Sequence, residues 1–435
     1  MFNNFNPKLN RNFYFIFIPS FLTVLLPFFL ITGPFLPDLA ISICGILFII
    51  NLFSSSFKSF HKYLLNKFFI YFILFWITIV ISSLISSDIL YSLKTSFFYI
   101  RFGIFTLSTW FLLEYNKKLI IFFFYSLSIC ISILIFDGFT QFILGINVFG
   151  WPIIDTRVSS FFKDEFVLGS YLSRLIPLCF AIFIYLDQNN LAKINKLFFV
   201  IIFILAEVLI FLSGERASFF FINLSCLFII FLCKNYKKIR ILILISSLII
   251  LCLITFFDDR FKKRIIDQTL EQAGILKNEN NLTNDIKIFY LFSKEHENHY
   301  RSAFLMFKEN KFLGIGPKLF RKNCNKEAFL ISNESCSTHP HNTYVQLLAE
   351  VGIIGFLQIF MIFLFLIYIS VKHFFLKINK NILLLTDFEI SILSCILITL
   401  WPFIPTGNFF GNWINVIYYL PVGFLLFFLS SKKLL

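Results

Sequence analysis

Charged residues are scarce in this chain. Asp, Glu, Lys and Arg make up 14% of the 435 residues, whereas a soluble domain usually carries about 25%. Glycine and proline, with 16 and 12 residues, are too few for a fibrous or disordered chain. Hydrophobic residues make up 58% of the chain, and the mean hydropathy of the chain is +0.83. The composition excludes a soluble protein and indicates an integral membrane protein.

The hydrophobic residues gather in long runs. About 20 predominantly apolar residues are enough to cross a bilayer as a helix. We therefore predict an all-α integral membrane protein with about twelve transmembrane helices, at residues 13–31, 35–53, 68–86, 96–114, 119–136, 166–186, 197–213, 217–233, 241–256, 345–371, 382–405 and 413–430. The connections predict a nine-helix region at 1–256, one large polar loop at 257–344 and a three-helix region at 345–435.

Positive charges are distributed unevenly between the two sides of the predicted bundle. The positive-inside rule counts Lys and Arg in short connections and leaves long translocated loops out. With a cytoplasmic N-terminus, the inner connections hold Lys8, Arg11, Lys58, Lys62, Lys67, Lys117, Lys118, Lys193, Lys196, Lys234, Lys237, Lys238, Arg240, Lys372, Lys377, Lys380, Lys432 and Lys433. The short outer connections hold Lys94, Arg157, Lys163 and Arg216. We therefore expect both termini in the cytoplasm, and the net charge of +14 becomes a topology signal that gives no reason to expect a nucleic-acid partner.

The 257–344 loop carries 14 Lys and Arg and 11 Asp and Glu residues, and topology places it outside. Chemistry is expected there. Residues 295–310 predict a helix in which Ala303, Phe304 and Phe307 form an apolar face. A shorter outer loop at 137–165 also carries aromatic and charged residues.

Two cysteines, Cys324 and Cys336, lie in the outer loop, where disulfides persist. We expect them to pair, which would stabilise the loop by about 3 kcal/mol in the chain-entropy model; the alternative is two free thiols. The other seven cysteines fall in or at the ends of apolar runs and act as small apolar residues.

Four outer histidines raise the question of a metal. His296 and His299 are three residues apart, whereas a helical zinc pair in HExxH is four apart. His339 and His341 flank Pro340, and an extended segment could present both to one ion, but a third ligand is missing at any recognisable spacing. No GxxxxGK[ST] motif is present either. We expect no metal and no nucleotide cofactor.

A longer pattern begins at the same histidine. His341-Asn342 is followed by nine residues and then by Gly352-x-x-Gly355, in HPHNTYVQLLAEVGIIG at 339–355. This resembles the O-antigen ligase and O-antigen polymerase superfamily of bacterial polytopic membrane glycosyltransferases, which carry such a signature after the large periplasmic loop. SGERAS at 213–218, YRSAFLMFKENKFLGIGPKLF at 300–320, and QFILGINVFG with RVSSFFKDEFVLGS across 141–170 are also similar.

The resemblance implies a GT-C-like fold in the bacterial inner membrane. It implies metal-independent transfer of a glycan from undecaprenyl pyrophosphate to an acceptor hydroxyl on the periplasmic face, without a cofactor. The leading interpretation is a ligase with lipid A-core as acceptor. A polymerase joining lipid-linked repeat units is a close alternative, and a protein O-oligosaccharyltransferase a weaker one. From another class, a lipid-linked anion transporter would also explain twelve helices, but transporters usually show repeated halves and broken helices.

The resemblance and the chemistry together assign roles to residues. His341 is the expected catalytic group that activates the acceptor hydroxyl, because a histidine pKa near 6.5 leaves much of the imidazole neutral. Arg216 and Arg301 are expected to bind the pyrophosphate; the alternatives are a headgroup anchor for Arg216 and a loop salt bridge for Arg301. Possible contacts to lipid phosphate or glycan are Arg101, Arg157, Arg174, His339 and Asn342.

Overall fold

The computed structural model describes residues 13–54, 57–193, 195–258 and 292–430, with the single positions 263, 270, 271 and 290. Within these ranges the chain is helical, and two isolated bridges, Ile146 with Pro152 and Ile154 with Arg157, are the extent of its β-pairing. The predicted charges at Lys8, Arg11, Lys432 and Lys433 lie outside the described residues.

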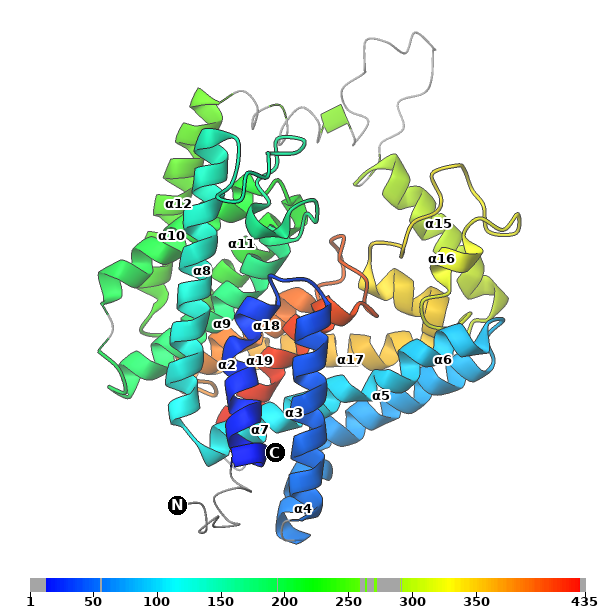
Figure 1. Ribbon diagram of the computed structural model, residues 1–435, viewed down its shortest axis with the longest axis horizontal. Helices are drawn as coiled ribbons and strands as arrows, with labels where there is room; N and C mark the ends of the chain where they lie inside the picture. The colour runs from blue at the N-terminus through cyan, green and yellow to red at the C-terminus, as the bar shows by residue number, and fades with distance from the viewer. Residues whose placement is uncertain are drawn as a thin grey trace, which may run out of the picture.

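Helices occupy the predicted apolar runs (Figure 1). In chain order they are η1 Phe13–Phe17, α2 Ile18–Phe29, α3 Phe35–Phe53, α4 Phe57–Leu64, α5 Lys67–Leu84, α6 Ile89–Phe98, α7 Ile100–Tyr115, α8 Lys118–Leu144, η2 Ser160–Phe162, α9 Leu168–Gln188, α10 Lys196–Leu212, α11 Arg216–Leu232, α12 Lys237–Phe257, α15 Lys294–Glu309, α16 Phe320–Asn323, α17 Thr343–Lys380, α18 Asp387–Thr399 and α19 Asn412–Ser430.

The described part holds 8 candidate membrane spans by length and apolar composition. They are α3, α5, α6 with α7, α8, α9, α12, α17 and α19. α11, with 17 residues, and α18, with 13, are shorter. The protein is therefore a helical, polytopic membrane protein, while the number of twelve crossings, the GT-C-like assignment and the division at 256 and 344 stay predictions.

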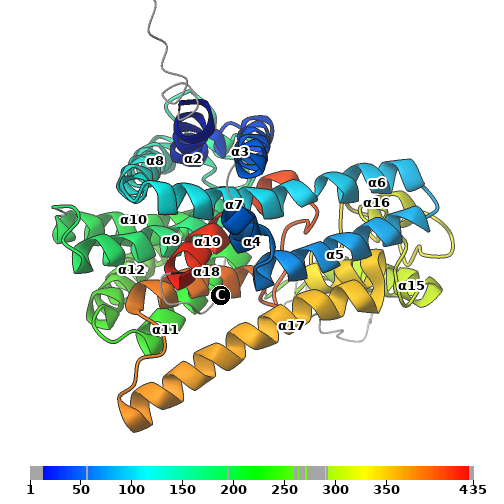
Figure 2. The same cartoon turned by 90° about the horizontal axis from the view of Figure 1, so that it is seen from below.

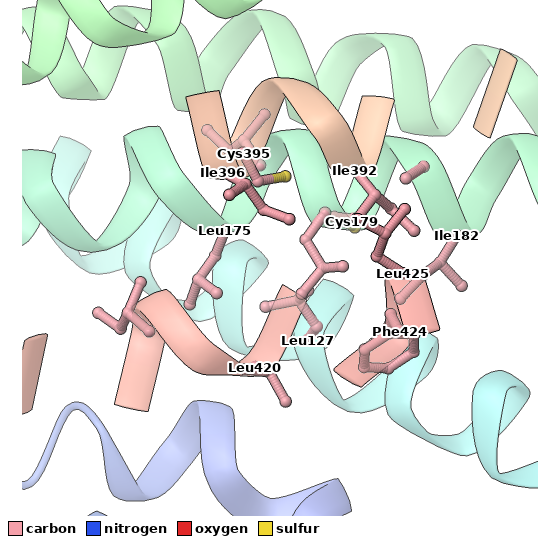
Figure 3. Close-up of a cluster of buried hydrophobic side chains, with 14 of the residues drawn as sticks. Leu127, Leu175, Cys179, Ile182, Ile392, Cys395, Ile396, Leu420, Phe424 and Leu425 are labelled. Atoms are coloured by element: carbon pink, nitrogen blue, oxygen red, sulfur yellow. The ribbon is translucent and has the colours of Figure 1, made fainter. Parts of the chain in front are cut away.

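The centre of the bundle is formed by α9, α18 and α19. Most of α9 is buried, and it packs against α18, while α19 packs against α7. Figure 3 shows apolar side chains of α8, α9, α18 and α19 meeting there, among them Leu127, Leu175, Ile392 and Phe424. This core fixes the helix ends from which the polar loops emerge.

Several helix boundaries differ from the predicted ones: α17 runs to Lys380 instead of ending at 371, and three further differences concern the loops near the site. α8 continues to Leu144 instead of ending at 136, because Asp137 and Gln141 are buried and bond the following loop: Ser160 Oγ donates to Asp137 at 2.5 Å and Ser160 N to Gln141 at 2.7 Å. The predicted 96–114 helix is broken at Tyr99, between α6 and α7.

The third difference lies in the predicted 382–405 helix, which stops at Thr399. Pro402 and Pro405 follow, and proline cannot donate the backbone hydrogen bond that continues a helix. Residues 400–411 therefore form a loop between α18 and α19, and this loop borders the site described below.

The described residues of the predicted outer loop, 292–342, pack as a layer on the start of α17, and we call this part the outer layer. Figures 1 and 2 show α15 and α16 beside α5, α6 and the beginning of α17. The predicted loop helix is confirmed as α15, but its buried face is Asn298, His299, Ser302, Ala303 and Met306. Phe304 is 51% exposed, so the predicted apolar face is wrong there: the smaller side chains allow α15 to approach α17, and Phe304 faces outward.

Cys324 and Cys336 form a disulfide, with their Cα atoms 5.1 Å apart. Cys324 belongs to a small apolar cluster with Ala303, Met306 and Phe320. The bond therefore ties the segment before His339 to the packed part of the outer layer.

Candidate functional site

Four histidines from two distant segments meet at the outer layer. The ring centroid of His341 lies 4.2 Å from that of His339 and 5.4 Å from those of both His296 and His299. The sequence predicted these residues separately, as poor metal ligand pairs. The structure gathers them around His341, and we call the four residues the histidine cluster.

Local structure positions each ring. Ser293 caps α15 by accepting a bond from His296 N at 3.2 Å, and its hydroxyl lies 2.7 Å from Nδ1 of the same histidine. His296 and His299 then lie one turn apart on the helix. His341 has a φ of 56°, a left-handed conformation that is rare for a residue with a Cβ and often marks a functional site.

His339 has both ring nitrogens engaged. Its Nε2 lies 3.2 Å from the carbonyl oxygen of Thr406, and its Nδ1 lies 2.9 Å from the hydroxyl of Thr338. A carbonyl only accepts, so Nε2 carries the proton and Nδ1 accepts from Thr338.

His341 is fixed through its backbone instead, because its carbonyl accepts a 2.8 Å bond from Thr406 N. Its imidazole makes no hydrogen bond to any described residue, which leaves the ring able to contact a substrate.

The cluster is electrically neutral at neutral pH. Burial, together with the neighbouring histidines, lowers the pKa of His341 to about 3. Burial likewise lowers the pKa of His339 and of His296 to about 4, and it lowers that of His299. The sequence-based expectation of a histidine near pKa 6.5 is therefore wrong for His341. The lowered pKa favours the neutral imidazole, which has one nitrogen that can accept a hydrogen bond and one N–H that can donate.

Asn342 caps α17. Its side-chain oxygen accepts bonds from Tyr344 N at 2.9 Å and Val345 N at 3.1 Å, and its amide donates to the carbonyl of Pro402 at 2.8 Å. The side chain is thus occupied in joining α17 to the 400–411 loop. Its possible glycan contact, predicted from the sequence, gains no support from this arrangement.

Gly352 of the signature and Gly314 of the GIGP turn allow two backbones to meet. Gly352 interrupts α17 with a φ of 69°, and a Cβ there would lie 2.3 Å from the carbonyl carbon of Phe312. Across this contact Ile353 N donates to Lys311 O at 2.8 Å, and Gly316 N donates to Glu350 O at 3.0 Å. The GxxG and GIGP motifs therefore lock the 311–316 segment onto the first turns of α17.

Arg216 begins α11, as the sequence predicted, and is half-buried. Next to it, the Glu215 carboxylate accepts from Gly169 N at 2.6 Å and Ser170 N at 2.9 Å. These amides belong to the first turn of α9, so this helix N-terminus is bound by the chain's own carboxylate. Burial raises the pKa of Glu215, while the nearby positive charge of Arg157 acts against that shift.

Arg157 packs into the same corner. Its Nε donates to Ser213 O at 3.1 Å, and its guanidinium lies 3.9 Å from the ring centroid of Phe166. The 137–165 loop thus supplies a second cation beside Arg216, which the sequence matched only loosely.

Residues 197–360 match the family model described as O-antigen ligase. The match supports the O-antigen ligase and polymerase superfamily over this segment. The matched range includes Arg216, Arg301, His341 and the Gly352-x-x-Gly355 pair, so the resemblance expected from the sequence is confirmed. A comparison with curated proteins gives no match.

The 400–411 loop contacts both the region of Arg216 and the region of His341 in the matched segment. Phe220, one turn after Arg216, contacts Trp401 with the two rings tilted and their centroids 6.4 Å apart. The neighbouring Pro402 accepts the bond from Asn342, next to His341. The 400–411 loop, whose first half the sequence predicted as helix, therefore links the predicted phosphate-binding and acceptor-activating residues.

Arg174 and Arg101 differ in their surroundings: Arg174 is buried against aromatic rings, and Arg101 is paired with a carboxylate. Arg174 of α9 is 2% exposed, takes part in no salt bridge within the described residues, and lies over Phe221 and Tyr418 at 5.1 and 5.6 Å. Arg101 is the second residue of α7, lies near the middle of the 89–115 span, and forms a 2.7 Å salt bridge with Asp38.

Arg301 lies on the exposed side of α15. Its side chain is 62% exposed and pairs with Glu297, one turn earlier on the same helix. His296 and His299 face the cluster, whereas Arg301 borders a shallow pocket with Phe304 and Val345. The described structure thus gives the loop salt bridge that was the alternative interpretation, and a role in pyrophosphate binding would require Arg301 to leave Glu297.

No group of three or more His, Cys, Asp or Glu side chains is arranged to hold a metal ion in the described ranges. The four histidines of the cluster therefore do not form such a group.

Two cations, Lys318 and Arg321, lie in the 310–323 part of the layer and had no role predicted from the sequence. Sequence reasoning missed both.

Proposed function

We propose that the protein is an O-antigen ligase-type glycosyltransferase that moves a glycan from undecaprenyl pyrophosphate to a hydroxyl of lipid A-core, on the periplasmic face of the bacterial inner membrane. The observation that carries this proposal is the O-antigen ligase match over 197–360, whose signature histidine stands at the centre of a neutral cluster with an uncommitted imidazole.

In the proposed reaction, the acceptor oxygen attacks the anomeric carbon of the donor glycan. The bond from that carbon to the pyrophosphate oxygen breaks, and undecaprenyl pyrophosphate leaves with the bonding electrons. His341 accepts the hydrogen bond of the acceptor hydroxyl and takes its proton as the new glycosidic bond forms. The proton then passes to solvent, so the histidine returns to its neutral form.

A pKa of about 3 makes the isolated His341 a weak base. A bound pyrophosphate would change this, because a nearby anion favours the imidazolium and raises the histidine pKa. The base would then strengthen when the donor is present. His339, fixed by Thr406, supports the adjacent ring from the other side.

Arg216 is the proposed principal ligand of the pyrophosphate. Guanidinium binds phosphate oxygens in a bidentate manner, and Arg157 adds a second positive charge in the same corner. Arg174 is a candidate for a lipid-phosphate contact, because a buried cation in a membrane protein usually faces a partner or a cavity.

The ligase proposal is tested by glycan profiling of a strain that lacks this protein. Unligated polymer accumulating on the lipid carrier supports a ligase. Lipid A-core bearing single repeat units would instead show a polymerase, the alternative that the superfamily also contains. If neither defect appeared, both proposals would be wrong.

Complementation of that strain tests Arg216. Arg216→Lys keeps the charge but loses the planar fork, so both transfer and donor affinity should fall sharply. Lys163→Ala, which removes an exposed cation from the neighbouring outer loop, is the matched control and should restore normal glycan. Full complementation by Arg216→Lys would contradict bidentate binding.

A further inference from the structure

Three cations from separate parts of the sequence interact electrostatically around Lys318, and one of them, Arg321, also acts on His339 of the histidine cluster. They are Arg101 at the start of α7, Lys318 in the GIGPKLF turn, and Arg321 in α16. Lys318 lies within electrostatic range of both arginines, and burial, followed by the Arg321 charge, lowers the pKa of its ammonium group. A set of like charges in a partly buried place is unfavourable unless something compensates it.

The nearby carboxylates are already engaged. Asp38 pairs with Arg101 at 2.7 Å. Glu350, fully buried, accepts from Phe320 N at 3.0 Å, from Gln346 Nε2 at 2.9 Å and from the backbone of Lys318. Neither Lys318 nor Arg321 forms a salt bridge with a described residue.

The backbone holds these two cations in place. Lys318 has a φ of 61°, a conformation that costs energy for a residue with a Cβ. Gly316 N and the following turn are bonded to Glu350, whose helix carries the GxxG motif. The lock between the GIGP turn and α17 thus fixes the position of Lys318 relative to α17.

Arg321 connects this group to the proposed catalytic residue. Its Nε donates to Thr338 O at 3.2 Å, and the Thr338 hydroxyl bonds His339, whose ring adjoins His341 at 4.2 Å. The remaining guanidinium nitrogens have no hydrogen-bond partner among the described residues. The Arg321 side chain therefore reaches the edge of the histidine cluster, and its other N–H groups are available as hydrogen-bond donors.

We propose that Lys318 and Arg321 form a phosphate-binding site beside the histidine cluster, with Arg101 as a supporting charge. Glu350 and Asp38 act on Lys318 only from a distance, and a phosphate group would supply the direct ion pair that these two side chains lack among the described residues. The identity of the phosphate bearer rests on the proposed function: it is either the donor pyrophosphate or a phosphate group carried by the acceptor. Both have the same chemistry, and both would be held next to His341.

Binding of inorganic pyrophosphate to the purified full-length protein tests the site by titration calorimetry. Lys318→Gln and Arg321→Gln should each weaken binding by about tenfold or more, as expected for a lost charge-assisted contact. Lys326→Gln removes an exposed lysine of the same loop and is the control, with an expected change of less than about twofold. Thermal unfolding establishes that each variant is folded, and Arg321→Lys, with an intermediate loss, replaces Arg321→Gln if the latter does not fold.

Transfer kinetics then distinguish the two sources of phosphate. A rise in the donor KM alone assigns the site to the donor pyrophosphate, and a rise in the acceptor KM alone assigns it to an acceptor phosphate. Unchanged pyrophosphate binding in both folded variants, or no binding by the wild type, overturns the proposal. If the wild type binds pyrophosphate through Lys318 and Arg321 but transfers no glycan, the site stands and the proposed function fails.

Discussion

The ring of His339 lies 4.2 Å from that of His341, and the two residues are separated in sequence by Pro340 alone. His339 is committed to Thr338 and Thr406, whereas the His341 ring bonds no described residue. One histidine of the pair therefore orients, and the other remains available for a substrate.

Acidification should destabilise the outer layer. His341, with a pKa of about 3, and His339 and His296, with pKa values of about 4, are below the ordinary value near 6.5 that the unfolded chain has. Between these limits the unfolded state binds more protons, so the free energy of unfolding falls as pH falls from about 6.5 toward 4. Melting temperatures measured across this range should decline.

The pH effect has a matched control. His296→Gln removes one titrating ring and should flatten the decline, while His61→Gln on the exposed face of α4 should leave it unchanged. An equally steep decline in wild type and His296→Gln would show that other groups cause it.

Gly352→Ala should weaken both stability and transfer. The new Cβ would lie 2.3 Å from the Phe312 carbonyl carbon at a φ of 69°, and such backbone strain costs about 1–3 kcal/mol. The 311–316 segment would separate from α17. Thermal unfolding and complementation measure the two effects.

Gly407→Ala is the comparison for that variant. Its Cβ would meet no atom closer than 3.9 Å, so it should retain nearly normal stability and activity. If Gly352→Ala behaved in the same way, close backbone contact would not explain the GxxG motif.

Loss of the disulfide should loosen the segment that precedes the catalytic histidine. Cys324→Ser should lower the stability of the outer layer by about 3 kcal/mol in the chain-entropy model and reduce transfer, while donor binding persists. Mass mapping of unreduced peptides tests the bond itself. Recovery of both cysteines as free thiols from the oxidised protein would contradict it.

The charge distribution predicts the orientation of the helices. A reporter fused after residue 290 should be periplasmic, and reporters after residues 236 and 376 should be cytoplasmic. Arg240 is weaker evidence for a cytoplasmic connection than the sequence indicated, because its side chain is buried and paired with Glu207 of α10. A cytoplasmic reporter at 290 would place the histidine cluster on the wrong side for a lipid-linked donor exported to the periplasm.

The helices were largely predictable because an apolar run of sufficient length has few other ways to satisfy its backbone in a membrane. The predicted 382–405 helix failed where Pro402 and Pro405 outweighed the apolar pattern. This wrong boundary affects the site, because the loop that replaces the end of the helix contributes Thr406 and Pro402 to it.

The site was less predictable than the helices. His341 was found through its signature, but the assembly of four histidines depends on how α15 docks on α17, which sequence spacing does not encode. Lys318 and Arg321 were missed because each is one of 14 cations in a polar loop. Their position beside Arg101 follows from the glycine lock, whose partner segments are more than 30 residues apart in sequence.

The most direct test of the account is glycan transfer by purified, folded His341→Ala protein, with donor binding measured on the same sample. The account predicts a turnover reduced by about 10²–10⁴-fold, as for a lost acid-base group, with donor affinity close to that of the wild type. His61→Ala should show neither change. Transfer by His341→Ala at a near wild-type rate would contradict the proposed role of His341 as the group that activates the acceptor.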